Sequence, residues 1–520
     1  MSPPRDLRAS LAQAGYTPGR RDVAPLVALL VDDPDAGPAV RRALARADAS
    51  VVAAAIVSAL DGAAEASAAR LVPALGDAAA TATAARVALL AGLDDARPRL
   101  RRAAVTALGK LGGDEARAAL CAYWDRPDLP ADHRRAAAEA LGKVGGDQAA
   151  LRLAATPADG GGDAELVRRR DRAILIALRD ADDAPSEVAL DVAPATPMVM
   201  VARCRAGLET VLAGELHDAG LAVDRLGPGL VGVILAGPLA PLLAARTLLT
   251  AGVVVELDRD ADADAIAQAL ARPEVQGLLT AWTRGPVRWR LDFERGGHRR
   301  ALVWAAAART RALAPALRNQ PRATTWDVVV TADQRHLELR PHRFTDTRFA
   351  WRVADVPAAS HPTIAAALAR VAGAHAGEQV WDPFCGSGAE LCERGQLGAA
   401  QLHGTDRDQR ALVAARANLD AAGLDATLVC GDALEHVPPP LDLIITNPPL
   451  GRRLRGDAAA LLERFAARVP GLLARHGRLV WITPAHERTG AVLRRGGLGL
   501  RFARDLDLGG YEARLERWQR

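Results

Sequence analysis

The sequence predicts a multidomain α + α/β protein with three parts: an N-terminal α-solenoid, an α/β middle domain and a C-terminal Rossmann-like domain with a seven-stranded sheet. Three observations predict this architecture. A motif in the helical N-terminal third repeats after 33 residues, from Arg101 to Arg134. The apolar pattern changes to alternating strands and helices after Met198. A glycine-rich turn at residues 382–388 and an Asn-Pro-Pro turn at Asn447 each follow an apolar run typical of a buried strand.

Length and composition place the chain among soluble multidomain proteins. At 520 residues it is too long for one core, so two to four domains are expected. No apolar run approaches a membrane span and residues 1–12 lack a signal-peptide core, so we expect a cytoplasmic protein without membrane contact. The five cysteines are dispersed without a C-x-x-C pair, which argues against a disulfide framework and a metal site.

The positive charge is concentrated in one segment. The net charge of the chain is +4, but residues 284–352 contain 15 Arg against 6 Asp and Glu, a surplus of +9. This distribution predicts a local basic surface.

Residues 1–180 resemble HEAT-like repeats. Residues 101–114 return as residues 134–147, and a degenerate copy begins at Arg169. Each copy has an apolar helix face, a Gly-Gly turn and a second helix that begins at an acidic cap, Asp114 or Asp147. Such repeats usually present a binding surface, so we expect a protein partner there; the alternative is that they only stabilise the fold.

Residues 181–197 are acidic and proline-rich and are predicted to be a linker that makes the solenoid separable. A domain at residues 198–354 follows. Predicted strands lie at residues 198–202, 230–235, 287–293, 326–331 and 336–340, and predicted helices at residues 207–219, 239–249 and 304–317.

The middle domain opens with residues 201–216, which read Val-Ala-Arg-Cys-Arg-Ala-Gly-Leu-Glu-Thr-Val-Leu-Ala-Gly-Glu-Leu. This run resembles the opening of THUMP-containing RNA methyltransferases, and the resemblance implies a ferredoxin-like segment before a THUMP-like RNA-binding module. The basic segment lies in the same domain, and arginine neutralises phosphates while aromatic rings can stack on unpaired bases. We expect about five of its seven aromatic residues to be core: Trp289, Phe293, Trp304, Trp326, Phe344, Phe349 and Trp351.

The C-terminal domain, residues 355–520, begins with a helix entry at Pro362, with Ser360 or His361 near its cap. Residues 380–388 then read Val-Trp-Asp-Pro-Phe-Cys-Gly-Ser-Gly, and residues 444–451 read Ile-Ile-Thr-Asn-Pro-Pro-Leu-Gly. The pair resembles the signature of class I S-adenosylmethionine (SAM) methyltransferases that act on planar amino nitrogens.

The spacing of acidic residues predicts the cofactor site. Asp406 lies 24 residues beyond Asp382, at the tip of the next strand, where its carboxylate can accept hydrogen bonds from ribose hydroxyls. Asp432 follows the third strand and could accept from the adenine amino group. The predicted SAM-binding residues are Asp382, Pro383, Phe384, Cys385, Gly386, Ser387, Gly388, Asp406, Arg407, Asp432, Ala433 and Asn447. Cys385 is expected to be a packing residue in the turn.

The predicted catalytic residues are Asn447, Pro448, Pro449 and Leu450. The Asn447 side-chain oxygen and the Pro448 carbonyl can hydrogen-bond an exocyclic amine and aim its lone pair at the methyl group. The resembled family usually has an aromatic residue where this chain has Leu450, which forfeits part of about 1–3 kcal/mol of base stacking. The next residues, 451–455, read Gly-Arg-Arg-Leu-Arg and could hold phosphates or form a solvated loop.

The leading hypothesis is therefore a SAM-dependent RNA methyltransferase, with guanine N2 of rRNA or tRNA as the target implied by the resemblance. The same Asn-Pro-Pro motif serves amino-methyltransferases of DNA and of protein glutamine, which stay as alternatives. A third alternative is a non-catalytic RNA-binding scaffold with a vestigial SAM fold, which Leu450 favours. The specific RNA, the nucleotide and the number of methyl groups do not follow from the sequence.

Overall fold

The computed structural model describes residues 6–13, 15–155, 162–179, 184–297, 299–357, 359–449, 458–508 and 512–520. The chain divides into two compact units, which are described separately. The first unit comprises Met1–Pro185, Asp262–Ala271 and His298–Gln320, and the second comprises Ser186–Ala261, Arg272–Gly297 and Pro321–Arg520. Within the described ranges, no helix has both the length and the apolar character needed to cross a membrane.

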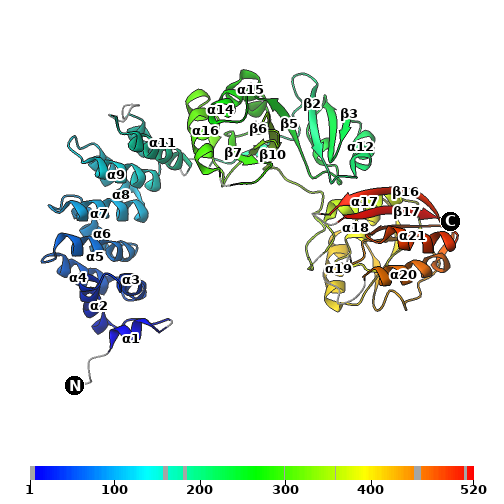
Figure 1. Cartoon of the computed structure of the whole chain (residues 1–520), viewed down its shortest axis with the longest axis horizontal. Coiled ribbons are helices and arrows are strands. Elements are labelled where there is room, and N and C mark those ends of the chain that lie inside the picture. The colour runs from blue at the N-terminus through cyan, green and yellow to red at the C-terminus, as the bar shows by residue number, and fades with distance from the viewer. Residues whose placement is uncertain are drawn as a thin grey trace. The chain divides into compact units, whose positions relative to one another are not determined.

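The first unit begins with a row of helices that pack mainly on their neighbours, as in the predicted α-solenoid (Figure 1). These helices are α1 (Leu7–Leu11), α2 (Arg20–Asp32), α3 (Gly37–Leu44), α4 (Ala49–Leu60), α5 (Glu65–Ala78), α6 (Thr83–Ala91), α7 (Pro98–Leu111), α8 (Asp114–Trp124), α9 (Ala131–Val144), α10 (Asp147–Ala154) and α11 (Ala164–Arg179). Helix α5 packs on α7, α7 on α9 and α9 on α11. These four helices therefore form one face of the row.

Glycines spaced 33 residues apart explain the close packing of that face. A Cβ atom on Gly109 of α7 would lie 2.7 Å from Cα of Ala140 in α9, and one on Gly142 of α9 would lie 2.7 Å from Cα of Ala173 in α11. Real Cβ atoms do not approach so closely, so these positions need glycine. The repeated Leu-Gly-Lys sequence thus brings adjacent helix backbones into contact.

The turns of the repeat differ from prediction at the acidic residues. Gly112 and Gly113 both have positive φ, which favours glycine and ends α7. Asp114 and Asp147 are the first residues of their helices, and glycine occupies each N-cap without a side-chain hydrogen bond. The two carboxylates therefore act on the helix dipole, and the prediction that they cap the helices was wrong.

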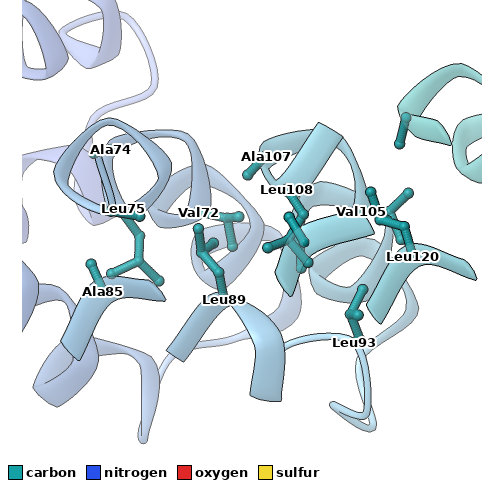
Figure 2. Packing of buried hydrophobic residues seen from close by; sticks show 14 of the residues in the cluster. Val72, Ala74, Leu75, Ala85, Leu89, Leu93, Val105, Ala107, Leu108 and Leu120 are labelled. Atoms are coloured by element: carbon teal, nitrogen blue, oxygen red, sulfur yellow. The ribbon is translucent and has the colours of Figure 1, made fainter. Parts of the chain in front are cut away.

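Leucine and alanine side chains fill the interior between the two layers of the solenoid. Leu75 of α5, Leu89 of α6 and Leu108 of α7 are each at most 1% exposed and belong to one continuous core (Figure 2). Burying each leucine contributes about 1.5–3 kcal/mol, so the stacked repeats, and no single repeat alone, supply the stability.

The last solenoid helix packs on a helix from much later in the sequence. The first unit also contains α14 (Ala263–Ala271), α16 (Arg300–Leu313) and β8 (Arg318–Asn319). Helix α11 contacts α16 and β8, and the Arg172 guanidinium lies 5.1 Å from the centre of the Trp304 ring. Within the first unit, a cation–π contact thus joins α11 to α16.

In the second unit, seven strands of one mixed sheet follow the order β3-β4-β2-β5-β10-β9-β7. They are β2 (Met198–Arg203), β3 (Ala222–Gly227), β4 (Leu230–Leu235), β5 (Thr250–Glu256), β7 (Arg288–Phe293), β9 (Trp326–Val330) and β10 (His336–Pro341). The helices of this part of the second unit are α12 (Glu209–Asp218), α13 (Ala240–Leu243) and α15 (Pro273–Ala281). The β7 and β9 strands are parallel and the other pairs are antiparallel.

Part of the predicted linker is structured. Strand β1 (Glu187–Val188) pairs with β6 (Thr283–Arg284), and Val188 is 2% exposed. The Ser186 hydroxyl donates to the Pro286 carbonyl oxygen at 2.7 Å. The segment from Ser186 to Val188 therefore belongs to the second unit and is not a free spacer.

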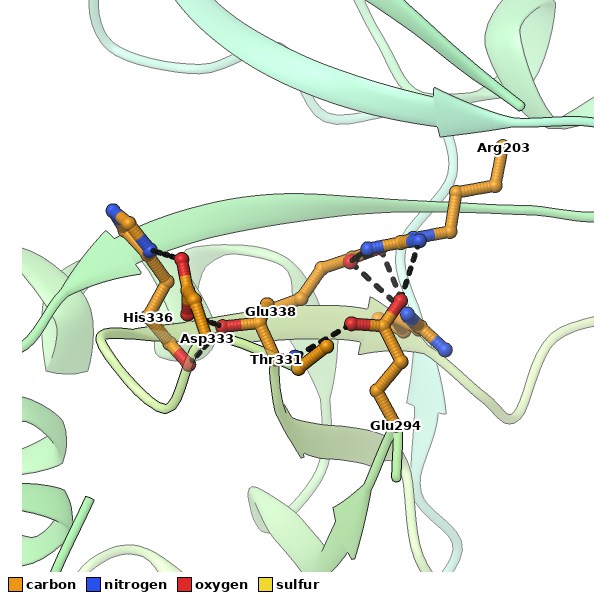
Figure 3. Close-up of polar contacts among 8 residues, drawn as sticks. Arg203, Glu294, Thr331, Asp333, His336 and Glu338 are labelled. Carbon is orange, nitrogen blue, oxygen red and sulfur yellow. Dashed lines mark hydrogen bonds and ion pairs between the residues drawn. The ribbon is translucent and has the colours of Figure 1, made fainter. Parts of the chain in front are cut away.

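A buried carboxylate joins β2 to β10 in this sheet (Figure 3). Glu338 is fully buried, with Arg203 Nη2 at 2.5 Å and Arg340 Nε at 2.8 Å from its carboxylate oxygens. Burial alone would raise the pKa of Glu338, but hydrogen bonds from Arg340 and Arg203 offset it and hold the pKa below its usual value. Arg203 also pairs with Glu294 at 2.8 Å. These arginines are structural.

Many arginines of the basic segment, residues 284–352, also have a structural role. At least seven of its fifteen, all of which are described, form ion pairs with carboxylates: Arg284, Arg290, Arg309, Arg335, Arg340, Arg348 and Arg352. Three others in the second unit are exposed, and none of the described carboxylates pairs with them: Arg295, Arg322 and Arg343. All seven aromatic residues of the segment are buried or half-buried. The surface for phosphates is therefore smaller than the charge count suggested.

The C-terminal sheet has the predicted seven strands, in the order β13-β12-β11-β14-β15-β17-β16. Its strands are β11 (Glu378–Asp382), β12 (Ala400–Asp406), β13 (Ala426–Cys430), β14 (Leu441–Thr446), β15 (Leu473–Thr483), β16 (Gly499–Asp507) and β17 (Glu512–Gln519). Its helices are α17 (Pro362–Ala372), α18 (Ala389–Gln396), α19 (Gln409–Ala421), α20 (Ala458–Leu472) and α21 (His486–Arg495). Strands β11 to β15 are parallel, and β16 and β17 form an antiparallel hairpin. The carboxyl ends of β11, β12, β13 and β14 therefore meet at one edge of the sheet.

Candidate active site at the carboxyl edge of the C-terminal sheet

The glycine-rich turn after β11 is held in a fixed conformation. The backbone N–H of Cys385 donates to the Thr405 carbonyl oxygen at 3.0 Å, which ties the turn to β12. Gly388 caps α18 with φ of 79°, and a Cβ atom there would lie 3.2 Å from Cβ of Ala415 in α19. Glycine is thus required for both the turn and the packing of two helices.

Asp406 and the turn are joined directly. Asp406 Oδ2 accepts from the Gly386 N–H at 2.9 Å, and its Oδ1 accepts from the Asp408 N–H at 2.9 Å. The Asp406 carbonyl oxygen also accepts from the Gly431 N–H at 3.0 Å. The ends of β11, β12 and β13, which were predicted to bind the cofactor, therefore lie together.

Asp432 and Arg407 form an ion pair with each other. Asp432 Oδ1 accepts from the Leu434 N–H at 2.8 Å, and Oδ2 pairs with Arg407. The Leu434 backbone hydrogen bond and the Arg407 guanidinium lower the pKa of Asp432. Asp432 is therefore ionised and oriented, with Ala433 buried beside it.

Other residues of the turn serve packing. The Phe384 ring meets the Phe465 ring edge-on, with ring centres 5.4 Å apart. Pro383, Cys385 and Ser387 are buried. Burial raises the pKa of the Cys385 thiol well above its usual value, so this sulfur stays protonated and is no nucleophile.

Asn447 presents one unsatisfied acceptor at the end of β14. Its Nδ2 donates to the Ser360 hydroxyl oxygen at 2.9 Å. Its Oδ1 is buried and has no hydrogen-bond partner among the described residues. Pro448 is buried and Pro449 is exposed, whereas Leu450 and residues 451–457 lie outside the described residues.

Ser360 fixes which end of the Asn447 amide faces outward. The Ser360 hydroxyl hydrogen-bonds to Oε1 of Glu390, in the first turn of α18. The hydroxyl donates its only proton to Glu390, so its oxygen must accept from Asn447. The amide nitrogen is therefore turned inward and Oδ1 is left for a ligand. Glu390 carried no sequence signal, because an acidic residue in a first helical turn ordinarily serves the dipole.

Two buried carboxyl groups give the site its charge preference. Burial, and then the nearby Glu390, raise the pKa of Asp382 well above its usual value. Burial also raises the pKa of Glu390 to about 7. Asp382 Oδ2 and the neighbouring Thr446 Oγ1 are buried, and neither completes a hydrogen bond within the described part of the chain. Leaving such atoms unpaired costs about 1–3 kcal/mol each, so the site favours a polar, positively charged ligand.

Comparisons with known proteins give matches to two domain families and to curated relatives. Residues 350–501 match the RMKL-like methyltransferase domain, and residues 86–160 match HEAT repeats. The tRNA (guanine(10)-N2)-dimethyltransferase of Methanothermobacter thermautotrophicus is 30% identical over 139 residues, 26% of this chain and 39% of that protein. The tRNA (guanine(6)-N2)-methyltransferase of Thermus thermophilus is 34% identical over 165 residues, 30% of this chain and 48% of that protein.

Among solved structures, TrmN from Thermus thermophilus is 26% identical with a TM-score of 0.49, over 62% of this chain and 99% of that chain. The chain spans less than half the length of the two curated relatives described above. The matches to known families are thus to the RMKL-like methyltransferase domain at residues 350–501 and to HEAT repeats at residues 86–160.

Proposed function

We propose that this protein transfers a methyl group from SAM to an exocyclic amino group of an RNA base, and that guanine N2 in tRNA is the target. The methyltransferase domain supports the reaction type, and the two relatives named as tRNA guanine-N2 methyltransferases support the substrate. The observation that carries the proposal is the buried and unpartnered Oδ1 of Asn447.

Asn447 would position the target amine. Its Oδ1 and the Pro448 carbonyl oxygen accept the two N–H groups, so the nitrogen lone pair is directed away from the protein toward the methyl group. SAM supplies a methyl group on a sulfonium, which is already a good leaving group. The chain therefore contributes alignment and exclusion of water, and a strong general base is not needed.

The three joined strand ends would hold the cofactor. The turn at residues 384–388 is bonded to Asp406, which has lone pairs left for ribose hydroxyls. Asp432 and the Ala433 backbone would contact the adenine end. Asp382 Oδ2 would accept from the positively charged amino-acid end, which would restore the ionised form of this buried carboxyl.

Exposed arginines of the middle domain would contact the RNA backbone. Arg295, Arg322 and Arg343 have no carboxylate partner among the described residues, so their charge is available to phosphates. Because aromatic residues of this segment are buried or half-buried, the segment contributes charge more than base stacking.

Comparing modified nucleosides tests this function. The gene is deleted in the source organism, and tRNA and rRNA nucleosides are compared by mass spectrometry. We expect N2-methylguanosine to fall in tRNA and to return when purified protein and SAM are added. Loss from rRNA alone would reassign the substrate. Protein that binds SAM and RNA yet methylates neither would favour the scaffold alternative.

The variant Asn447→Ala separates methyl transfer from substrate binding. This variant should lose methyl transfer by at least about 100-fold, because alignment of the amine depends on Oδ1. Its affinity for tRNA should stay within about twofold of the wild type, since Asn447 would contact only the target amine of the RNA. Undiminished transfer by the variant would contradict the mechanism.

A further inference from the structure

A basic groove crosses the row of helices in the first unit. It has a volume of about 1170 Å³ and lies over α3, α5, α7 and α9. Its charged lining residues are five cations and two carboxylates: Arg41, Arg70, Arg99, Arg102, Lys110, Asp77 and Asp132. The groove therefore carries a positive surplus on a surface whose partner neither the family match nor the relatives identify.

Two of the cations are available to a ligand. Arg41 pairs with Asp77 at 2.6 Å, and Arg102 pairs with Asp132 at 3.2 Å. Arg99 and Lys110 are exposed, and neither side chain has an acidic partner among the described residues. They stand on one face of α7, eleven residues or about 16 Å apart along the helix, with the exposed Arg102 between them.

The floor of the groove consists of small side chains. Ala66 and Ala69 of α5 and Ala103 and Ala107 of α7 line it, together with Gly76. None of its lining residues is Trp, Tyr or Phe. The His133 ring also lines the groove but is buried, so the surface offers no aromatic platform for unpaired bases. Without large apolar pockets it also lacks the anchor sites of peptide-binding grooves. Charge is the recognition element that remains.

We propose that this groove binds the phosphate backbone of double-helical RNA, with Arg99 and Lys110 as its phosphate contacts. A duplex presents phosphates without exposing base faces, which matches cations on a floor of small residues. The choice of RNA over an acidic protein segment as the ligand rests on the proposed function. The positive charge of the groove is observed independently of that function. The HEAT repeats would thereby enlarge the RNA-binding surface of the enzyme.

Charge reversal in the full-length protein tests the groove. The variant Arg99→Glu/Lys110→Glu is compared with the control variant Arg20→Glu/Arg21→Glu. The control also reverses two exposed positive charges, but on α2 and outside the groove. Affinities for purified total tRNA, a plain RNA duplex and poly-glutamate are measured by fluorescence anisotropy over a range of salt concentrations. Thermal melting and SAM affinity check that each variant is folded.

We expect the groove variant to bind tRNA and duplex at least about tenfold more weakly at low salt than the control variant. The slope of log affinity against log salt should also fall by about 2, one for each phosphate that the variant no longer neutralises. An affinity and slope equal to those of the control would overturn the proposal. Loss of poly-glutamate binding with RNA binding intact would instead assign the groove to an acidic protein. RNA binding that depends on the groove in a protein without methyl transfer would contradict the proposed function alone.

Discussion

The Asn447 side chain has a donor end and an acceptor end, and its neighbours decide which faces the target amine. The Ser360 oxygen accepts from Nδ2, and the Ser360 hydroxyl donates a hydrogen bond to Oε1 of Glu390. Ser360→Ala removes this restraint and leaves the amide free to turn, so we expect kcat to fall about 10- to 100-fold while the dissociation constant of SAM is unchanged. Ser360→Thr retains the hydroxyl and should restore most of kcat. Steady-state kinetics with tRNA measure both, and equal losses in the two variants would contradict the positioning role.

Glu390 links the same network to stability. Burial raises its pKa from the usual 4.5 to about 7, so the ionised form is less favourable in the folded than in the unfolded protein. The free energy of unfolding contributed by this group is therefore lost as pH rises from about 4.5 to 7. Glu390→Gln removes the titration and keeps an acceptor for Ser360.

We expect the stability of Glu390→Gln, relative to the wild type, to increase over that pH range by about 3 kcal/mol and to level off above it. Denaturant unfolding at several pH values gives the difference, which includes a smaller rise in the pKa of Asp382 in the variant, because Glu390 helps to raise it. A difference that does not vary between about pH 4.5 and 7 would show that Glu390 is not the buried titrating group.

At the scale of elements, glycine decides how closely the solenoid helices pack. Gly109→Ala would place Cβ 2.7 Å from Cα of Ala140. Overpacking costs about 1–3 kcal/mol, whereas replacing a helical glycine by alanine gains about 1 kcal/mol, so the clash dominates. We expect a net loss of stability of up to about 2 kcal/mol, seen as a lower melting temperature. Gly62→Ala is the control, because no atom lies within 4 Å of its new methyl group, and it should be neutral or slightly stabilising.

Elements with a strong local signal were predictable from the sequence. The 33-residue repeat and the strands ending at Asp382 and Asp406 carry their apolar period and turn residues within a few positions. Helices α14 and α15 and strand β5 were not predicted, because their small or evenly apolar residues show no clear period. Local patterns also could not reveal Glu390, since its partner Ser360 is 30 residues away in the sequence.

At the scale of the whole molecule, the boundary after the solenoid differs from the predicted linker at residues 181–197, because part of that segment is packed in the second unit. Val188 is buried in the second unit, and Ser186 bonds to Pro286. Within the first unit, α11 contacts α16, and Arg172 of α11 lies over the Trp304 ring of α16. Composition marked the change of pattern but could not show these long-range interactions.

These interactions make the choice of truncation point decisive. A fragment of residues 184–520 keeps β1 and should bind SAM with the affinity of the full chain, because every proposed cofactor residue lies in it. A fragment of residues 198–520 lacks β1 and its pairing with β6, so it should melt at a lower temperature than the longer fragment. Both should melt below the full chain, since α16 no longer packs on α11. Calorimetry gives the SAM affinities and the melting temperatures. Equal melting of the two fragments would show that β1 adds nothing to the second unit, and failure of the longer fragment to bind SAM would make the solenoid part of the catalytic core.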